Sequence, residues 1–254
     1  MKEVNCLEVI INEPGGYRFI KGVFPYSAGV SSLLGFAIER VRFKNVVPMA
    51  EGFQRIASHL GSLHRPLTAL CACELRSPEP FTEEGFRGFN RDYGDVLKQW
   101  DIFVDGINPI TRSNVCPELK PPSTPGFFAF SYTVPVESNT PTFVIAGCGE
   151  VPEGKGNYRD HIVSLADTSP EGILLKARWV LGEQERRLNS LGFQWKDVTA
   201  TQLYTIHDPH QLLASEFAAR GVMDAGLTWH YCRPPVEGIE FEMDCRGIGK
   251  ELVV

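Results

Sequence analysis

The stretch MAEGFQRIASHLGSLHRPLTALCACEL, residues 49–75, encodes a helix followed closely by a strand. Its first part repeats apolar residues every three or four positions, which predicts an amphipathic helix over residues 49–63. Pro48 suits the first turn of that helix. The apolar face consists of Met49, Phe53, Ile56, Ala57, Leu60 and Leu63. The second part, from Leu67 to Leu75, is predicted to be a strand.

The same helix-then-strand pattern returns farther along the chain. A second periodic segment ends at Leu191-Gly192, as the first ends at Leu60-Gly61, and each is followed by a strand that contains a threonine. The offset between the two copies is about 130 residues, which indicates an internal duplication. The apolar face of the second copy consists of Ile173, Ala177, Val180, Leu181, Leu188 and Leu191.

Each copy has a second predicted helix. One runs over residues 82–100 with Thr82 as its N-cap, and the other opens at Asp208-Pro209 and closes near Gly221. The remaining strands are predicted at 36–43, 127–134, 142–147, 198–206, 227–232 and 239–245. The sequence therefore predicts an α+β protein of two tandem units, residues 1–134 and 135–254, joined near Val134 to Asn139. Each unit is expected to be a mixed sheet with two helices packed on one face.

Composition excludes several classes of protein. Of the 254 residues, 43% are hydrophobic and 22% charged, which is typical of a globular chain. The net charge of −6 argues against a nucleic-acid partner. The longest apolar runs are too short to cross a membrane, and the N-terminus resembles no secretory signal. Seven cysteines without a C-x-x-C pair favour a reducing, cytoplasmic location over a disulfide framework or a zinc site.

The first unit contains three short motifs, Pro25-Tyr26-x-x-Gly29-Val30, Asn90-x-x-Tyr93 and Pro109-x-x-Arg112-Ser113. Together they resemble the RidA (YjgF) family of imine deaminases. Pro25 to Val30 is similar to that family's Pro-Tyr-x-x-Gly-Val, and Phe89 to Tyr93 to its Val-Asn-x-x-Tyr. Pro109 to Ser113 resembles its Pro-Ala-Arg-Ser, and Pro121 follows Arg112 at the family's spacing of nine residues. The resemblance implies the chorismate-mutase-like fold for each unit.

The second unit carries a different part of the family pattern. Phe143 to Gly147 resembles the strand that ends in Ser-Gly, and Ile239 to Glu242 resembles the terminal Ile-Glu-Ile-Glu strand. Conversely, the first unit has Phe127 or Phe128 where the family has its glutamate, and the second unit has no arginine near Gly226. Neither unit alone holds a full site, so the arginine side is expected from the first unit and the glutamate side from the second.

The resemblance implies hydrolysis of a small carboxylate-bearing imine or enamine, similar to 2-aminoacrylate or 2-aminomuconate, with release of ammonia. Arg112 would bind the substrate carboxylate and Glu240 would orient the attacking water. Tyr26, Asn90 and Gly147 would complete the binding site. No cofactor, metal, nucleic acid or membrane partner is expected, and the family's single-unit trimers imply a homotrimer.

Plain structural roles compete with these assignments. Arg112 could form a surface ion pair, Tyr26 could pack a loop, and Asn90 could face solvent. Glu240 and Glu242 alternate with apolar residues, so both could point to water. Cys148, between two glycines, could be an exposed thiol. The alternative functions are a non-catalytic binding or regulatory protein for 2-oxo acids and a chorismatase-like enzyme, because chorismatases also use two RidA-like units.

Overall fold

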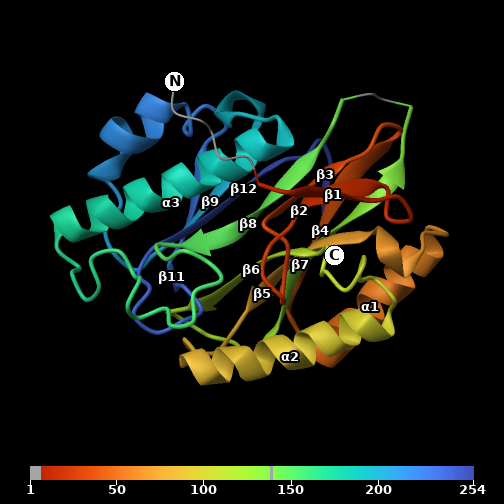
Figure 1. The fold of residues 1–254 in the computed structure, drawn as a ribbon, viewed down its shortest axis with the longest axis horizontal. Helices are drawn as coiled ribbons and strands as arrows, with labels where there is room; N and C mark the ends of the chain where they lie inside the picture. Colours follow the sequence, from red (N-terminus) through yellow and green to blue (C-terminus); the bar gives the residue numbers. More distant parts are fainter. Residues whose placement is uncertain (1–6, 138–139) are drawn as a thin grey trace.

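The computed structural model describes residues 7–137 and 140–254. Two β-sheets lie between two layers of helices, with α1 and α2 on one outer side and α3 on the other (Figure 1). Met1 to Asn5 and the Ser138-Asn139 part of the expected join lie outside the described residues. Both sheets mix parallel and antiparallel pairs, so the predicted α+β class with mixed sheets is confirmed.

The six-stranded sheet is built mainly from the first half of the chain. Its strands lie in the order β11, β6, β5, β7, β4, β13. Their bounds are Cys232–Arg233, Thr111–Pro117, Leu70–Arg76, Gly126–Pro135, Phe36–Pro48 and Glu251–Val253. Helices α1 (Met49–Ser62) and α2 (Glu83–Gln99) cover its outer face. Phe53, Ile56 and Leu97 pack there against strand residues such as Phe127.

The seven-stranded sheet combines the second half of the chain with its beginning. Its order is β1, β2, β3, β8, β12, β9, β10. The bounds are Val9–Asn12, Tyr17–Ile20, Gly29–Ser32, Phe143–Gly149, Glu242–Gly247, Ala200–Tyr204 and Leu227–His230. Helix α3 (Pro170–Leu191) covers the outer face, and its Ala177, Val180 and Leu181 enter the core.

The first strands of the chain do not join the sheet of the residues that follow them. β3 pairs with β8, more than a hundred residues away, in the register Val30↔Val144. The chain then crosses to the six-stranded sheet between Ser32 and Phe36, and Gly35 makes this turn at φ 80°. Division of the chain at residue 134 therefore stays a prediction about its origin, since residues 9–32 complete the sheet of the other half.

Three of the four predicted helices are α-helices, whereas the fourth is a shorter helical segment of another type. Within residues 208–221, a π-helix spans Leu213–Phe217 and a 3-10 helix spans Ala218–Arg220. The buried apolar side chains here, Leu212 and Phe217, are five positions apart. That spacing fits the i→i+5 geometry of a π turn better than an α-helix. Gly221, at φ 81°, ends the segment where the sequence predicted.

Candidate active site

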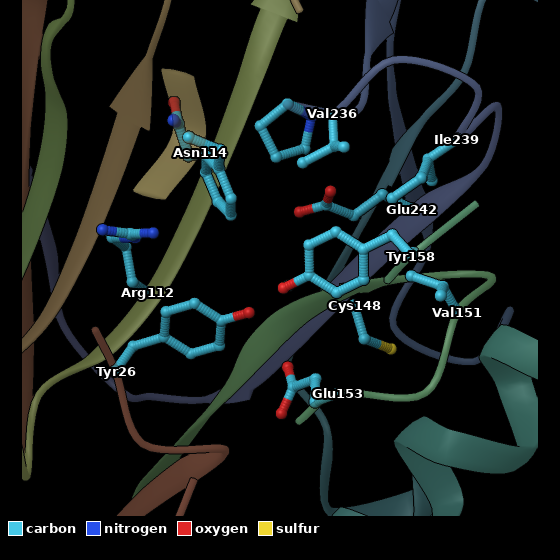
Figure 2. Close-up of a pocket in the computed structure, with 14 residues that line it drawn as sticks. Tyr26, Arg112, Asn114, Cys148, Val151, Glu153, Tyr158, Val236, Ile239 and Glu242 are labelled. Carbon is cyan, nitrogen blue, oxygen red and sulfur yellow. The ribbon is translucent and has the colours of Figure 1, made fainter. Parts of the chain in front are cut away.

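A cavity that contains Arg112 lies between the two sheets. About 490 Å³ of space, counting the part open to solvent, is enclosed by side chains from both halves of the chain. β6 contributes one wall, while β8, β12 and the loops after β8 and before β12 contribute the other (Figure 2). The lining residues are Tyr26, Phe86, Arg112, Asn114, Gly147, Cys148, Gly149, Val151, Glu153, Tyr158, Pro235, Val236, Ile239 and Glu242.

Arg112 is buried in the β6 wall and only partly satisfied. Its Nη2 donates to Asn90 Oδ1 on α2 at 2.6 Å, but its buried Nη1 has no hydrogen-bond partner. The rings of Tyr93 and Tyr26 hold the guanidinium at 4.8 and 5.0 Å. Burial lowers the pKa of Arg112 from its ordinary value. A buried guanidinium N–H without a partner costs about 1–3 kcal/mol, and a ligand carboxylate would remove that cost.

Glu242, the first residue of β12, points into the cavity from the side opposite Arg112 (Figure 2). The residue is 4% exposed, and within the described part of the chain its carboxyl group has no hydrogen-bond or ion-pair partner. Burial, followed by the charge of Asp244, raises the pKa of Glu242 well above its usual value. A carboxyl group whose pKa is raised in this way is suited to act as an acid.

Gly147 makes room for Glu242. A Cβ at position 147 would collide with Glu242 Oε1 and would lie 3.1 Å from Ser113 Oγ. The Gly147 backbone N–H also donates to Ser113 Oγ at 3.1 Å, which ties β8 to β6 across the sheets. A side chain at this position would therefore displace Glu242.

Two tyrosine hydroxyls point into the same cavity, from Tyr26 and Tyr158 (Figure 2). Burial, followed by the charge of Glu153, raises the pKa of both groups, so both remain hydrogen-bond donors. Glu83 in the first turn of α2 holds the loop of Tyr158 by accepting from its backbone N–H at 2.8 Å. Glu153 is paired with the buried Arg187 at 3.0 Å.

The structure brings three of the five predicted site residues into this cavity, namely Arg112, Tyr26 and Gly147. Asn90 is 6% exposed and lies behind Arg112, where its carbonyl oxygen fixes the guanidinium. Its side chain borders a neighbouring groove, together with Arg87 and Arg91, and does not line the cavity that contains Arg112.

Glu240 does not line the cavity that contains Arg112. Its carboxylate lies 2.9 Å from His207 Nε2 and 3.9 Å from Arg233 Nη1, at the edge of another groove. A contact with a distant residue explains this: the buried carboxylate of Glu150 accepts hydrogen bonds from the backbone N–H groups of Glu240 and Phe241. The chain thus enters β12 only at Glu242, which occupies the place expected for Glu240.

The structure also bears on a reactive thiol, a metal site and a membrane span. Cys148 is 4% exposed, and burial raises the pKa of its thiol to about 12, so it is no ready nucleophile. In residues 7–137 and 140–254, no three His, Cys, Asp or Glu side chains gather as a metal site. No helix in those ranges is long and apolar enough to cross a bilayer.

Comparison with solved structures shows the fold over nearly the whole chain. A chorismatase crystal structure matches 95% of this chain and 80% of its own, with a TM-score of 0.54 and 10% identity. The predicted two-unit α+β scaffold is confirmed by this match and by the two mixed sheets. The yjgF gene product of E. coli, 14% identical, matches 43% of this chain and 81% of its own, with a TM-score of 0.31.

Comparison of sequences gives the family. The 2-amino-5-chloromuconate deaminase of Comamonas testosteroni is 48% identical over 249 residues, which cover 97% of this chain and 99% of the relative. The family described as 2-aminomuconate deaminase CnbZ matches residues 9–252. The predicted deaminase function is confirmed at this level, and the chain belongs to the CnbZ family of 2-aminomuconate deaminases.

Proposed function

We propose that this chain hydrolyses 2-aminomuconate, or a closely related dicarboxylate enamine, in the cavity between its two sheets. One observation carries the proposal: Arg112, whose buried Nη1 has no hydrogen-bond partner, lies across a single cavity from the carboxyl group of Glu242. A cation without a counter-ion and an acid without a base partner are both kept buried, which is costly unless a ligand uses them.

Arg112 is suited to bind the carboxylate next to the amino-bearing carbon. Asn90 and the flanking rings of Tyr26 and Tyr93 leave the guanidinium one free edge, which fixes the direction from which a carboxylate can bind. The bound substrate then lies opposite Glu242, and the hydroxyls of Tyr26 and Tyr158 point into the same cavity. Orientation of this kind supplies a large part of the rate in reactions with water.

Glu242 is suited to move the protons. Its acid form donates to the carbon next to the amino-bearing carbon, which converts the enamine into an iminium ion. The resulting carboxylate takes a proton from the water that attacks the C=N carbon, and it then passes that proton to the nitrogen. The C–N bond breaks as ammonia leaves, and the proton of the new hydroxyl group returns to Glu242. The products are ammonia and the 2-oxo acid, and the acid form is restored.

The family membership favours this reaction over the two alternatives, a non-catalytic 2-oxo acid-binding protein and a chorismatase-like enzyme. The chorismatase match at 10% identity concerns the fold alone. A homotrimer stays a prediction of the family resemblance, and a cytoplasmic location stays a prediction from the cysteine usage. Light scattering of the purified protein would test the trimer.

The proposal is tested by ammonia release from freshly generated 2-aminomuconate. We expect the wild type to accelerate release over buffer, and Arg112→Ala to lower kcat/KM by roughly a hundredfold, the loss of a charge-assisted contact. Arg87→Ala is the matched control, because Arg87 lies on exposed α2 surface with 61% of its side chain accessible. No release by a folded wild type would refute the proposed function. Equal activity of both variants would refute the role of Arg112.

A further inference from the structure

A second buried donor stands beside Arg112 on β6. Asn114 follows Arg112 by two positions, so both side chains point to the same face of the strand. Each residue is 3% exposed, and both line the cavity. The Nδ2 of Asn114, like the Nη1 of Arg112, is buried without a hydrogen-bond partner.

The amide of Asn114 is held in one orientation. Its Oδ1 accepts from Ser77 Oγ at 3.0 Å, and the backbone N–H of Ser77 is bound to Val115 O at 3.0 Å. With its oxygen occupied, the amide is left with its NH₂ group free. The surrounding wall is apolar, formed by Pro235, Val236 and Phe86. An apolar side chain would fill this place without leaving a buried donor unpaired. The presence of the amide therefore indicates that a ligand supplies the missing acceptor.

Arg112 and Asn114 are close enough on β6 for one six-carbon dicarboxylate to reach both side chains. Residues two apart on a strand are separated by roughly 6.6 Å. The two carboxylate carbons of an extended six-carbon chain are separated by roughly 6 Å, since five bonds of about 1.5 Å zigzag between them. Figure 2 shows Asn114 and Arg112 along one wall with Glu242 across from them, so a chain that joins the two donors passes in front of Glu242.

We infer that Asn114 binds the second carboxylate of the substrate. Arg112 and Asn114 then bind one carboxylate each, which favours six-carbon dicarboxylates over monocarboxylates of the same length. This inference rests on the proposed function for the identity of the site, but it concerns binding and does not need turnover.

The test uses two unreactive probes with the same diene chain. Muconate has a carboxylate at both ends, and sorbate (hexa-2,4-dienoate) has one carboxylate and a methyl group. Titration calorimetry is done on wild type and on Asn114→Leu, which keeps the side-chain size. We expect wild type to bind muconate about tenfold to a hundredfold more tightly than sorbate. Asn114→Leu should lose that preference while its sorbate affinity stays within about twofold.

A second variant guards against misfolding. Asn114→Asp keeps the shape and can still accept from Ser77, but it removes the donor and adds a negative charge, so it should weaken muconate more than sorbate. Equal loss for both probes, or no preference in wild type, would overturn the inference. A wild type that prefers muconate but releases no ammonia from 2-aminomuconate would refute the proposed function and leave this inference standing.

Discussion

Two buried arginines of the six-stranded sheet differ in how their guanidinium groups are paired. Arg40 on β4 holds Glu74 with two hydrogen bonds of 2.5 and 2.7 Å and Glu251 with a third of 2.9 Å. Arg112 on β6 has one neutral partner, Asn90, and leaves Nη1 unpaired. Two similarly buried guanidinium groups thus differ: that of Arg40 is bound by two carboxylates, and that of Arg112 has one N–H group without a partner.

The acids near these arginines show the same difference. Burial opposes ionisation of Glu74, but the effect of the Arg40 guanidinium is larger and holds the pKa of Glu74 far below its usual range. At Glu242, burial and the charge of Asp244 outweigh the charges of Arg76 and Arg112, so the pKa is raised. Glu251 also binds Arg246 of β12 at 2.7 Å, which connects the sheets. The saturated cluster, Arg40 with Glu74 and Glu251, therefore holds the two sheets together. The incomplete cluster, Arg112 and Glu242, keeps polar groups unpaired that a ligand can use.

Breaking the saturated cluster should have the largest effect on stability. Arg40→Ala leaves the carboxylate of Glu74 buried without its main partner, so the free energy of unfolding should fall by about 3–5 kcal/mol. Arg55→Ala is the control, because the Arg55–Glu51 pair is exposed and should contribute about 1 kcal/mol or less. Urea denaturation measures both. A loss for Arg40→Ala no larger than for Arg55→Ala would contradict the structural role of the cluster.

Displacing the acid of the incomplete cluster should affect activity more than stability. Gly147→Ala would push the carboxyl group of Glu242 aside, and a misplacement of about 1 Å commonly lowers kcat a hundredfold. Gly182→Ala on α3 is the matched control, since no neighbouring atom lies within 4 Å of the added Cβ. Steady-state deamination by the two variants decides the point. Unchanged kcat in Gly147→Ala would show that the position of Glu242 is unimportant.

Removing the charge of Glu242 should stabilise the fold, with a dependence on pH. Because the pKa of Glu242 is raised in the folded state, its favourable contribution is complete below the unfolded value of about 4.3 and is lost as pH rises. Glu242→Gln should therefore gain stability over wild type with increasing pH, by at most about 1.4 kcal/mol for each pH unit. Urea denaturation from pH 5 to 8 measures this gain. A constant difference across that range would contradict a protonated Glu242.

The parts of the fold that rest on local periodicity could be predicted from the sequence. The apolar faces of α1, α2 and α3 gave those helices within a few residues. The pairing of β3 with β8 could not be predicted, because contacts between distant strands leave no local pattern. The segment at 208–221 has good capping residues but too few buried apolar positions for a regular α-helix, and it forms π and 3-10 helices instead.

The site was predictable where family motifs cover it, at Arg112, Tyr26 and Gly147. Glu240 and Glu242 could not be distinguished, because strand alternation gives both the same face. The deciding group is Glu150, a buried carboxylate ninety residues earlier that binds the backbone before β12 and is itself paired with buried Lys176 at 3.1 Å. Asn114 could have been found by following the two-residue alternation from Arg112 along the strand.

The most direct test of the account compares Glu242→Gln with Glu240→Gln in the turnover of 2-aminomuconate. The two residues are two positions apart, and only Glu242 lines the cavity with Arg112. We predict that Glu242→Gln lowers kcat by roughly 10²- to 10⁴-fold, as expected for loss of an acid–base group, and that Glu240→Gln stays within about twofold of wild type. Full activity in Glu242→Gln together with a large loss in Glu240→Gln would contradict the central claim.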